Sequence, residues 1–351
     1  MKLIHCSDLH LDSKMEALPP HKAKERASEI LLGFERMAKY AAENGVRAIM
    51  ICGDMFDTQR VSAATVSFVL NVVRSVPQVD FLYLRGNHDE RHSAFAGRDL
   101  PKNLRLFSDK WQGYDYGEAV IWGAELHEGM YDALPFDKSR CNIVMLHGQV
   151  SGEAGEDNVC LPRLRNCGIS YLALGHIHSF SRDRLDNSGI WCYCGCFEGR
   201  GFDECGEKGF VLLDVGERNT AVFVPFAGRK LHNVEVDISG LCTVAEIRDA
   251  MKSAGADIDK MDMVKFTLTG SYDTDTQKDI RFLRRALEED FYFVKVKDES
   301  RLGLAKSDYI NDASLKGAFI REVMASDMDE ARKEQVILCG LRALKGEEAE
   351  L

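Results

Sequence analysis

Residues 46–57, VRAIMICGDMFD, form an apolar run that stops at a glycine and an aspartate. A short apolar run bounded by turn residues predicts a buried strand over Val46–Cys52. The carboxylate of Asp54 then follows the strand directly. In open α/β sheets the loops at the carboxyl ends of strands hold ligand-binding groups. This stretch therefore predicts an α/β fold with its chemistry at one edge of a sheet.

The same pattern occurs at four further places along the chain. The motifs that follow apolar runs are Asp8-Leu9-His10, Gly86-Asn87-His88-Asp89, His147-Gly148 and Gly175-His176-Ile177-His178. Periodic apolar residues predict a helix over residues 23–41, and Ser62 predicts the start of another helix that runs to residue 75. We expect the later strands, including 210–215 and 221–225, to form a second, largely antiparallel sheet.

The motifs together supply two carboxylates, one amide oxygen and four imidazoles. One histidine beside a strand end is usually structural, but this ordered set predicts a binuclear metal site. Seven ligands, with the Asp54 carboxylate bridging, would leave each of two divalent cations an open position. Oxygen and imidazole ligands suit Mn²⁺, with Fe or Zn²⁺ as alternatives. The predicted ligands are Asp8, His10, Asp54, Asn87, His147, His176 and His178.

His88 follows Asn87 immediately and therefore points in a different direction. We expect it to bind the substrate phosphate and to protonate the departing oxygen. Such a histidine needs a partner on its other ring nitrogen. Asp57 is the first candidate for this partner and Asp89 the second. The alternative for Asp57 is a structural carboxylate in a turn or a cap.

Composition limits the classes of protein that are open. The chain has 351 residues and a formal net charge of −11, which argues against a broadly basic nucleic-acid binder without excluding DNA as a substrate. No apolar run reaches the roughly 20 residues needed to cross a bilayer. The first residues lead straight into a predicted strand, which leaves no room for a signal peptide. We therefore expect a cytoplasmic protein without a membrane span.

Three domains are predicted. Residues 1–228 form the catalytic α/β domain, and residues 229–299 form a small α+β domain in which strands and helices alternate. Residues 300–351 form a tail with two amphipathic helices over about 312–346. The tail helices would either dock a partner or pack against the chain itself.

The five motifs resemble those of the calcineurin-like metallophosphoesterase superfamily over residues 1–225. The resemblance implies a four-layer α/β/β/α sandwich with a dinuclear centre between its two sheets. It also implies that one metal is held by Asp8, His10, Asp54 and His178, and the other by Asp54, Asn87, His147 and His176. His88 matches the catalytic histidine of the family and Asp57 its hydrogen-bond partner.

Within the superfamily the chain is most similar to the SbcD-type DNA repair nucleases, in particular the bacterial YhaO-like branch. The closer similarity lies in residues 7–13, 53–57, 175–178 and 202–209, and residues 229–237 resemble the entry into the capping domain of these nucleases. The resemblance implies a coiled-coil ABC-type ATPase partner, SbcC-like or YhaN-like, that docks C-terminal helices. It also implies a homodimer as one state of assembly.

Three functions follow from these features. The first is two-metal hydrolysis of phosphodiester bonds in DNA, as an exonuclease or endonuclease subunit of a repair complex. The second is hydrolysis of small molecules such as cyclic nucleotides or nucleotide-sugar pyrophosphates, which the acidic net charge favours. The third is a non-catalytic scaffold, which the presence of His88 disfavours.

Overall fold

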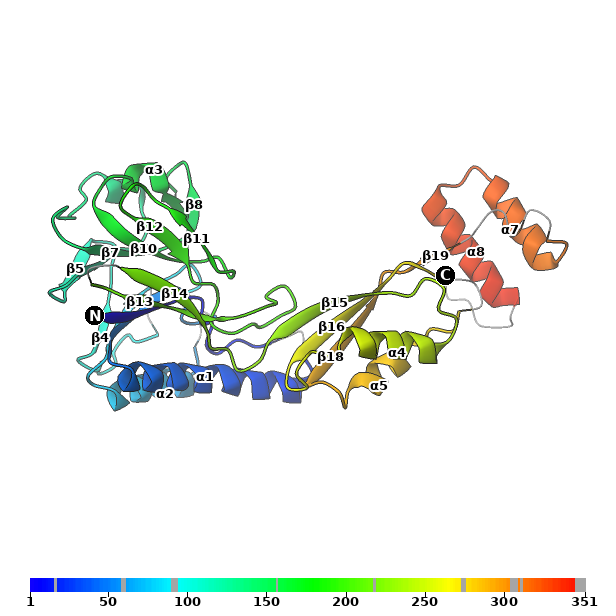
Figure 1. Ribbon diagram of the computed structural model, residues 1–351, viewed down its shortest axis with the longest axis horizontal. Coiled ribbons are helices and arrows are strands. Elements are labelled where there is room, and N and C mark those ends of the chain that lie inside the picture. Colours follow the sequence, from blue (N-terminus) through cyan, green and yellow to red (C-terminus); the bar gives the residue numbers. More distant parts are fainter. Residues whose placement is uncertain are drawn as a thin grey trace. The chain divides into compact units, whose positions relative to one another are not determined.

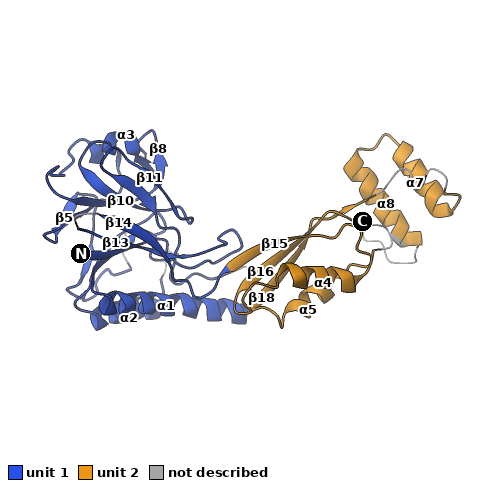
Figure 2. Cartoon of the chain, viewed as in Figure 1, with its two compact units in different colours: residues 1–230 blue, residues 231–351 orange. Residues whose placement is uncertain are grey.

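The computed structural model describes residues 1–15, 18–57, 61–89, 94–155, 157–216, 219–272, 276–303, 309 and 312–344. The chain divides into two compact units, residues 1–230 and residues 231–351 (Figure 2). The predicted division into three domains at residues 228 and 299 stays a prediction. Residues 345 and 346, at the end of the predicted tail helices, lie outside the described residues.

The first unit contains a six-stranded sheet in the order β14-β13-β1-β2-β3-β4. The four strands β1 to β4 are parallel, and β13 pairs with β1 in the antiparallel sense. Helix α1 joins β1 to β2 and helix α2 joins β2 to β3, which are the crossovers that parallel neighbours need. The bounds are β1 Lys2–Cys6, α1 Pro20–Glu43, β2 Val46–Cys52, α2 Ala63–Ser75, β3 Asp80–Leu84, β4 Leu104–Leu106, β13 Gly209–Asp214 and β14 Thr220–Pro225.

A second six-stranded sheet has the order β11-β12-β10-β7-β6-β5. The prediction that this sheet is largely antiparallel is wrong, because β6, β7, β10 and β12 are parallel and only the edge strands β5 and β11 are antiparallel. The segment between β7 and β10 is long enough for the crossover that parallel neighbours need. The strands expected at 210–225 pair in the first sheet instead. The bounds are β5 Gln112–Asp115, β6 Val120–Gly123, β7 Asn142–His147, β10 Ile169–Gly175, β11 Ser181–Arg184 and β12 Ile190–Tyr193.

The two sheets pack face to face around one hydrophobic core, to which β2 contributes Met50 and β7 contributes Met145. Helices α1 and α2 cover the outer face of the first sheet (Figure 1), where the rings of Phe34 and Phe81 lie 5.9 Å apart. The outer face of the second sheet carries only thin cover from the 3₁₀ turn η1 (Glu128–Tyr131), the short strands β8 (Gln149–Ser151) and β9 (Asn158–Cys160), and α3 (Leu161–Leu164). The expected four layers are present, and the fourth is the thinnest.

The second unit contains a parallel three-stranded sheet, β15-β16-β18, with helices α4 and α5 packed on it. The predicted alternation of strands and helices is confirmed. Helices α7 and α8 pack against each other through Ile320, Val323, Ile337 and Leu341. The bounds are β15 Leu231–Asp237, α4 Val244–Ala254, β16 Met263–Thr269, β17 Ser271–Tyr272, α5 Ile280–Leu287, β18 Phe293–Asp298, β19 Arg301–Leu302, α7 Leu315–Ala325 and α8 Glu330–Leu344.

Within the described residues, none of the helices has both the length and the apolar character that a membrane span requires.

Candidate metal centre

The predicted ligands meet at one edge of the two packed sheets. Asp8 and His10 follow β1, Asp54 follows β2 and Asn87 follows β3. From the second sheet, His147 is the last residue of β7, and His176 and His178 follow β10. Because all five strands end at the same edge, residues that are up to 170 positions apart in the chain face one another.

The backbone at this edge is strained in order to aim these side chains. Four of the seven predicted ligands have a positive φ, namely Asp8 at 51°, His10 at 46°, Asp54 at 49° and His176 at 99°. Residues other than glycine adopt this conformation at a cost, and such residues gather at functional sites. Glycine is also required here, because a Cβ on Gly53 would lie 2.0 Å from Nδ1 of His147.

One group of ligands gathers around Asp8, which is 1% exposed. Nε2 of His10 lies 3.2 Å from Nε2 of His178, and the latter lies 3.7 Å from Oδ1 of Asp8. One potential ligand atom from each of these residues lies within 4.8 Å of the others. The backbone N–H of His176 also donates to Asp8, which ties the two sheets together at the site.

A second group gathers around Asn87. Nε2 of His147 lies 2.9 Å from Oδ1 of Asn87 and 3.5 Å from Oδ2 of Asp54. Nδ1 of His176 lies 3.3 Å from the same Asn87 oxygen. Asp8, Asp54 and His147 also have potential ligand atoms within 4.8 Å of one another, so the two groups are adjacent. The bridging role of Asp54 stays a prediction.

In His147 and His178, the ring nitrogen that faces away from the other candidate ligands makes a hydrogen bond that indicates a fit to divalent cations. Nδ1 of His147 donates to the Cys52 carbonyl at 2.9 Å, and Nδ1 of His178 donates to Glu204 at 2.7 Å. In a neutral ring Nε2 is then the acceptor nitrogen, which is the atom that a metal ion can use. Nε2 of a neutral His147 and Oδ1 of Asn87 are both acceptors 2.9 Å apart, and they repel unless a proton or a metal ion lies between them. The two rings are therefore arranged to bind a cation through Nε2.

The ionisation of His147 and Asp54 supports this interpretation. Burial alone would lower the pKa of His147, but contact with the negatively charged Asp54 outweighs burial and raises the pKa to about 9. Burial likewise opposes ionisation of Asp54, but His147 lowers the pKa of this carboxyl to about 2. A proton occupies the position at neutral pH until a metal ion replaces it.

His88 lies on the more exposed side of the first group. Its backbone N–H donates to Oδ1 of Asp54 at 3.0 Å, and its ring centroid lies 5.3 Å from that of His10. Asp57 is close by, because His10, Asp57 and His88 have potential ligand atoms within 4.8 Å of one another. Oδ1 of Asp57 contacts Nδ1 of His10 at 3.1 Å, at an angle outside the hydrogen-bond range. The pairing of Asp57 with His88 stays a prediction.

Asp89, the second candidate partner of His88, has a structural function in this loop. Its carboxylate accepts hydrogen bonds from the backbone N–H groups of Met55, Phe56 and Gly86, at 3.0–3.2 Å. It therefore ties the loop after β2 to the loop after β3. Burial raises the pKa of this carboxyl despite these hydrogen bonds.

The sequence did not indicate the contribution of residues 200–208 to the site. Arg200 and Glu204 contact Asp57 and His178, and Nζ of the buried Lys208 donates to the carbonyl of His178 at 2.7 Å. In the sequence, residues 202–209 indicated only a family likeness. The signal that could have revealed them is a cluster of charged residues between two apolar strands.

A cleft of about 650 Å³ lies beside the second group of ligands and includes Asn87 and His147 in its wall. Its other charged residues are mostly acidic, with Glu125, Glu128 and Asp157 among them. The one arginine in the wall, Arg85, forms a bidentate ion pair with Glu125 at 2.6 and 2.8 Å. The cleft therefore offers the reacting centre room for a ligand, but little positive charge of its own.

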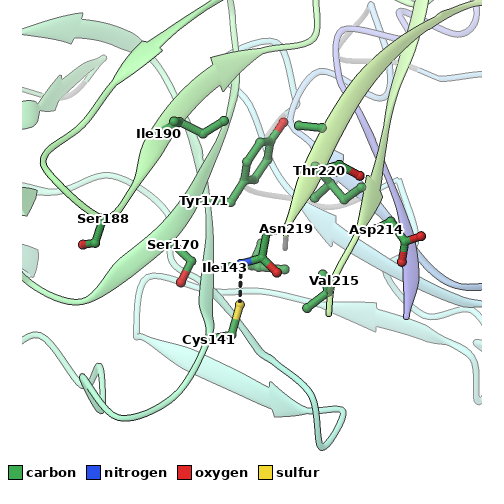
Figure 3. Close-up of a pocket in the computed structure, with 12 residues that line it drawn as sticks. Cys141, Ile143, Ser170, Tyr171, Ser188, Ile190, Asp214, Val215, Asn219 and Thr220 are labelled. Carbon is green, nitrogen blue, oxygen red and sulfur yellow. Dashed lines mark hydrogen bonds between the residues drawn. The ribbon is translucent and has the colours of Figure 1, made fainter. Parts of the chain in front are cut away.

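A smaller pocket, of about 150 Å³, lies near the amino ends of β7, β10 and β12 (Figure 3). Its wall includes Cys141, Ser170 and Ile190. Ser170 precedes His176 by six residues of extended chain, which span about 20 Å. The pocket is therefore remote from the predicted metal ligands.

Two packed mixed sheets with oxygen and imidazole ligands at one edge define a metal-dependent phosphoesterase. Residues 1–180 match the calcineurin-like phosphoesterase family, and the chain belongs to that family. The family fold binds divalent metal ions, for which the clustered ligands are the candidates.

Three curated proteins show how similar the chain is to its relatives. It is 26% identical to the uncharacterized metallophosphoesterase YhaO of Bacillus subtilis over 61% of this chain and 57% of that protein. It is 23% identical to the DNA double-strand break repair protein Mre11 of Aeropyrum pernix over 68% of this chain and 64% of that protein. It is 20% identical to the SbcD component of the nuclease SbcCD of Escherichia coli over 96% of both chains. The chain thus spans less than two thirds of YhaO and of this Mre11.

Proposed function

We propose that the protein hydrolyses phosphodiester bonds in DNA as the nuclease subunit of a repair complex. The observation that carries this proposal is the convergence of the seven predicted ligands at one edge, with His88 beside them. The names of two relatives, a double-strand break repair protein and a nuclease component, support DNA as the substrate. Cleavage by an exonuclease and cleavage by an endonuclease are both compatible with this proposal.

Asp8, His10, Asp54 and His178 would hold one metal ion, and Asp54, Asn87, His147 and His176 the other. We propose Mn²⁺, with Fe or Zn²⁺ as alternatives, because oxygen and imidazole ligands suit these ions. When bound, a metal pair lowers the pKa of a water molecule and neutralises charge on the phosphoryl oxygens.

The chain itself contributes a proton. The imidazole of His88 is exposed and is not needed as a ligand, so it can bind the phosphate and donate its proton to the departing oxygen. Asp57, among the ionisable groups nearest to it, would orient the ring. The backbone hydrogen bond from His88 to Asp54 fixes the position of this residue relative to the metal ligands.

A second candidate function is hydrolysis of a small phosphoester such as a cyclic nucleotide or a nucleotide-sugar pyrophosphate. The acidic cleft beside Asn87 and His147 favours it, because a long polyanion gains little there and about 650 Å³ is ample for one nucleotide. A DNA backbone would have to reach the metal ions by another face or with the help of a partner.

We further propose that a coiled-coil ABC-type ATPase, SbcC-like or YhaN-like, binds the α7–α8 helices in the cytoplasm. Leu315 on α7 and Leu344 on α8 support this, because their side chains are 71% and 48% exposed. They lie outside the apolar contact through which the two helices pack against each other. A homodimer is a further proposed state of assembly.

Substrate preference tests the proposed function. Purified protein with Mn²⁺ should degrade linear duplex DNA and leave cyclic nucleotides intact. The His88→Ala protein, purified in the same way, should lose this activity, which excludes a contaminating nuclease. The solvent-exposed His21→Ala protein is the matched control and should retain it. Rapid hydrolysis of cyclic nucleotides with no action on DNA would replace the first function by the second.

A further inference from the structure

The outer ring nitrogen of His178 is held by a carboxylate from a distant loop. Nδ1 of His178 lies 2.7 Å from Oε1 of Glu204, which is 5% exposed. A carboxylate that accepts this hydrogen bond fixes the proton on Nδ1 and leaves Nε2 as the metal-binding nitrogen. Glu204 also makes the imidazole a stronger base and therefore a better ligand.

Glu204 is in turn held by Arg200. Oε2 of Glu204 accepts from the backbone N–H of Arg200 at 2.7 Å, and Oε1 accepts from Nη2 at 2.9 Å. Nη1 of the same guanidinium donates to Oδ1 of Asp57 at 2.5 Å. Oδ1 of Asp57 lies 3.1 Å from Nδ1 of His10, a close polar contact whose angle is outside the hydrogen-bond range. The Arg200 guanidinium therefore bridges Glu204 and Asp57. These two carboxylates lie beside Nδ1 of the two histidines in the first ligand group.

The second ligand group is supported differently. Nδ1 of His147 donates to the backbone carbonyl of Cys52, which is neutral and belongs to a buried strand. The first group thus has two carboxylates, the Arg200 guanidinium and the Lys208 ammonium around it, whereas Nδ1 of His147 has only a neutral carbonyl as its partner. Because a carboxylate that accepts from Nδ1 makes an imidazole a stronger ligand than a neutral carbonyl does, the first group should bind a divalent ion more tightly.

We propose that Arg200 is a positioning residue that clamps Glu204 and Asp57 behind His178 and His10, and that it makes this metal position the tighter of the two. Arginine suits this function because its planar fork can donate to two carboxylates at once. Without the guanidinium, the carboxylates of Glu204 and Asp57 would repel each other and turn away from the histidines. Lysine would keep the charge but could not hold both carboxylates in place.

This inference rests on the metal centre and not on DNA as the substrate, so it is tested by metal binding. Mn²⁺ titrations followed by electron paramagnetic resonance and by calorimetry should resolve a tight and a weaker site in the unsubstituted protein. Arg200→Lys, Arg200→Ala and Glu204→Gln should each weaken the tight site by about 10–100-fold and leave the weaker site within about twofold. Arg140→Lys is the matched control, because Arg140 pairs with Asp115 at an exposed position, and it should change neither site.

Three outcomes would overturn the inference. The first is unchanged binding in the variants, and the second is equal weakening of both sites, which would indicate a general loss of structure. The third is the absence of two distinguishable sites in the unsubstituted protein. Arg200→Lys guards against misfolding of Arg200→Ala, and thermal unfolding of each variant shows which proteins are folded. If the protein does not hydrolyse DNA but its two metal sites differ in affinity as described, the proposed function is wrong and this inference still holds.

Discussion

Gly53→Ala tests how strictly the fold requires close approach of the two sheets at the metal centre. Gly53 has φ +88°, and a Cβ at this position would lie 2.0 Å from Nδ1 of His147. The left-handed backbone would cost an alanine about 1–2 kcal/mol. To restore ordinary contact, His147 would also have to move by about 1.4 Å, and a displacement of about 1 Å at a reacting centre can cost about 100-fold in rate.

The assay is hydrolysis of bis(p-nitrophenyl) phosphate with Mn²⁺, together with the metal content of each protein. Gly117→Ala is the matched control, because Gly117 has φ +81° and nothing within 4 Å of the added Cβ. Gly117→Ala should lose only the stability that the left-handed backbone costs, whereas Gly53→Ala should lose more because of the overlap with His147, and only Gly53→Ala should lose about 100-fold or more in kcat. Equal activity of the two variants would refute the assignment of His147 to the centre.

Three further predictions concern the proton, the metal and the tail. His88→Ala should keep its metal content and lose about 10²–10⁴-fold in kcat, because a positioned proton donor is removed; retained activity would refute its role as an acid. Since a proton with a pKa of about 9 must leave His147 before a metal binds there, apparent Mn²⁺ affinity should rise about tenfold per unit from pH 7 to 8, and calorimetry that shows no pH dependence would contradict this. A chain that ends at Glu299 should still cleave a simple phosphodiester but fail to co-purify with the coiled-coil ATPase, and a complex that persists would place the docking surface elsewhere.

The fold of the first unit was largely predictable because the candidate ligands follow apolar strands directly. The run over Val46–Cys52 predicts the strand, and Asp54 follows it at the sheet edge as expected. Where strands are polar and short, the pattern is absent. Strand β11 reads Ser-Arg-Asp-Arg over Ser181–Arg184, for example, and no apolar alternation marks it.

Contacts between distant parts of the chain set the limit of the sequence-based prediction. Arg200 meets Asp57 across 143 residues, and no local pattern reports such a pairing. The sense of pairing in the second sheet also depends on where the segment between β7 and β10 runs, which local periodicity does not specify. The candidate metal ligands could be named because their order along the chain is informative, whereas the residues that contact them from distant parts of the chain form no such series.

Anomalous scattering from crystals grown with Mn²⁺ tests the central claim most directly. Two peaks about 3.5–4 Å apart are expected, one beside His10 and His178 and the other beside Asn87 and His147. The absence of peaks at these residues, or a metal ion bound elsewhere in the catalytic unit, would contradict the assignment of a dinuclear centre.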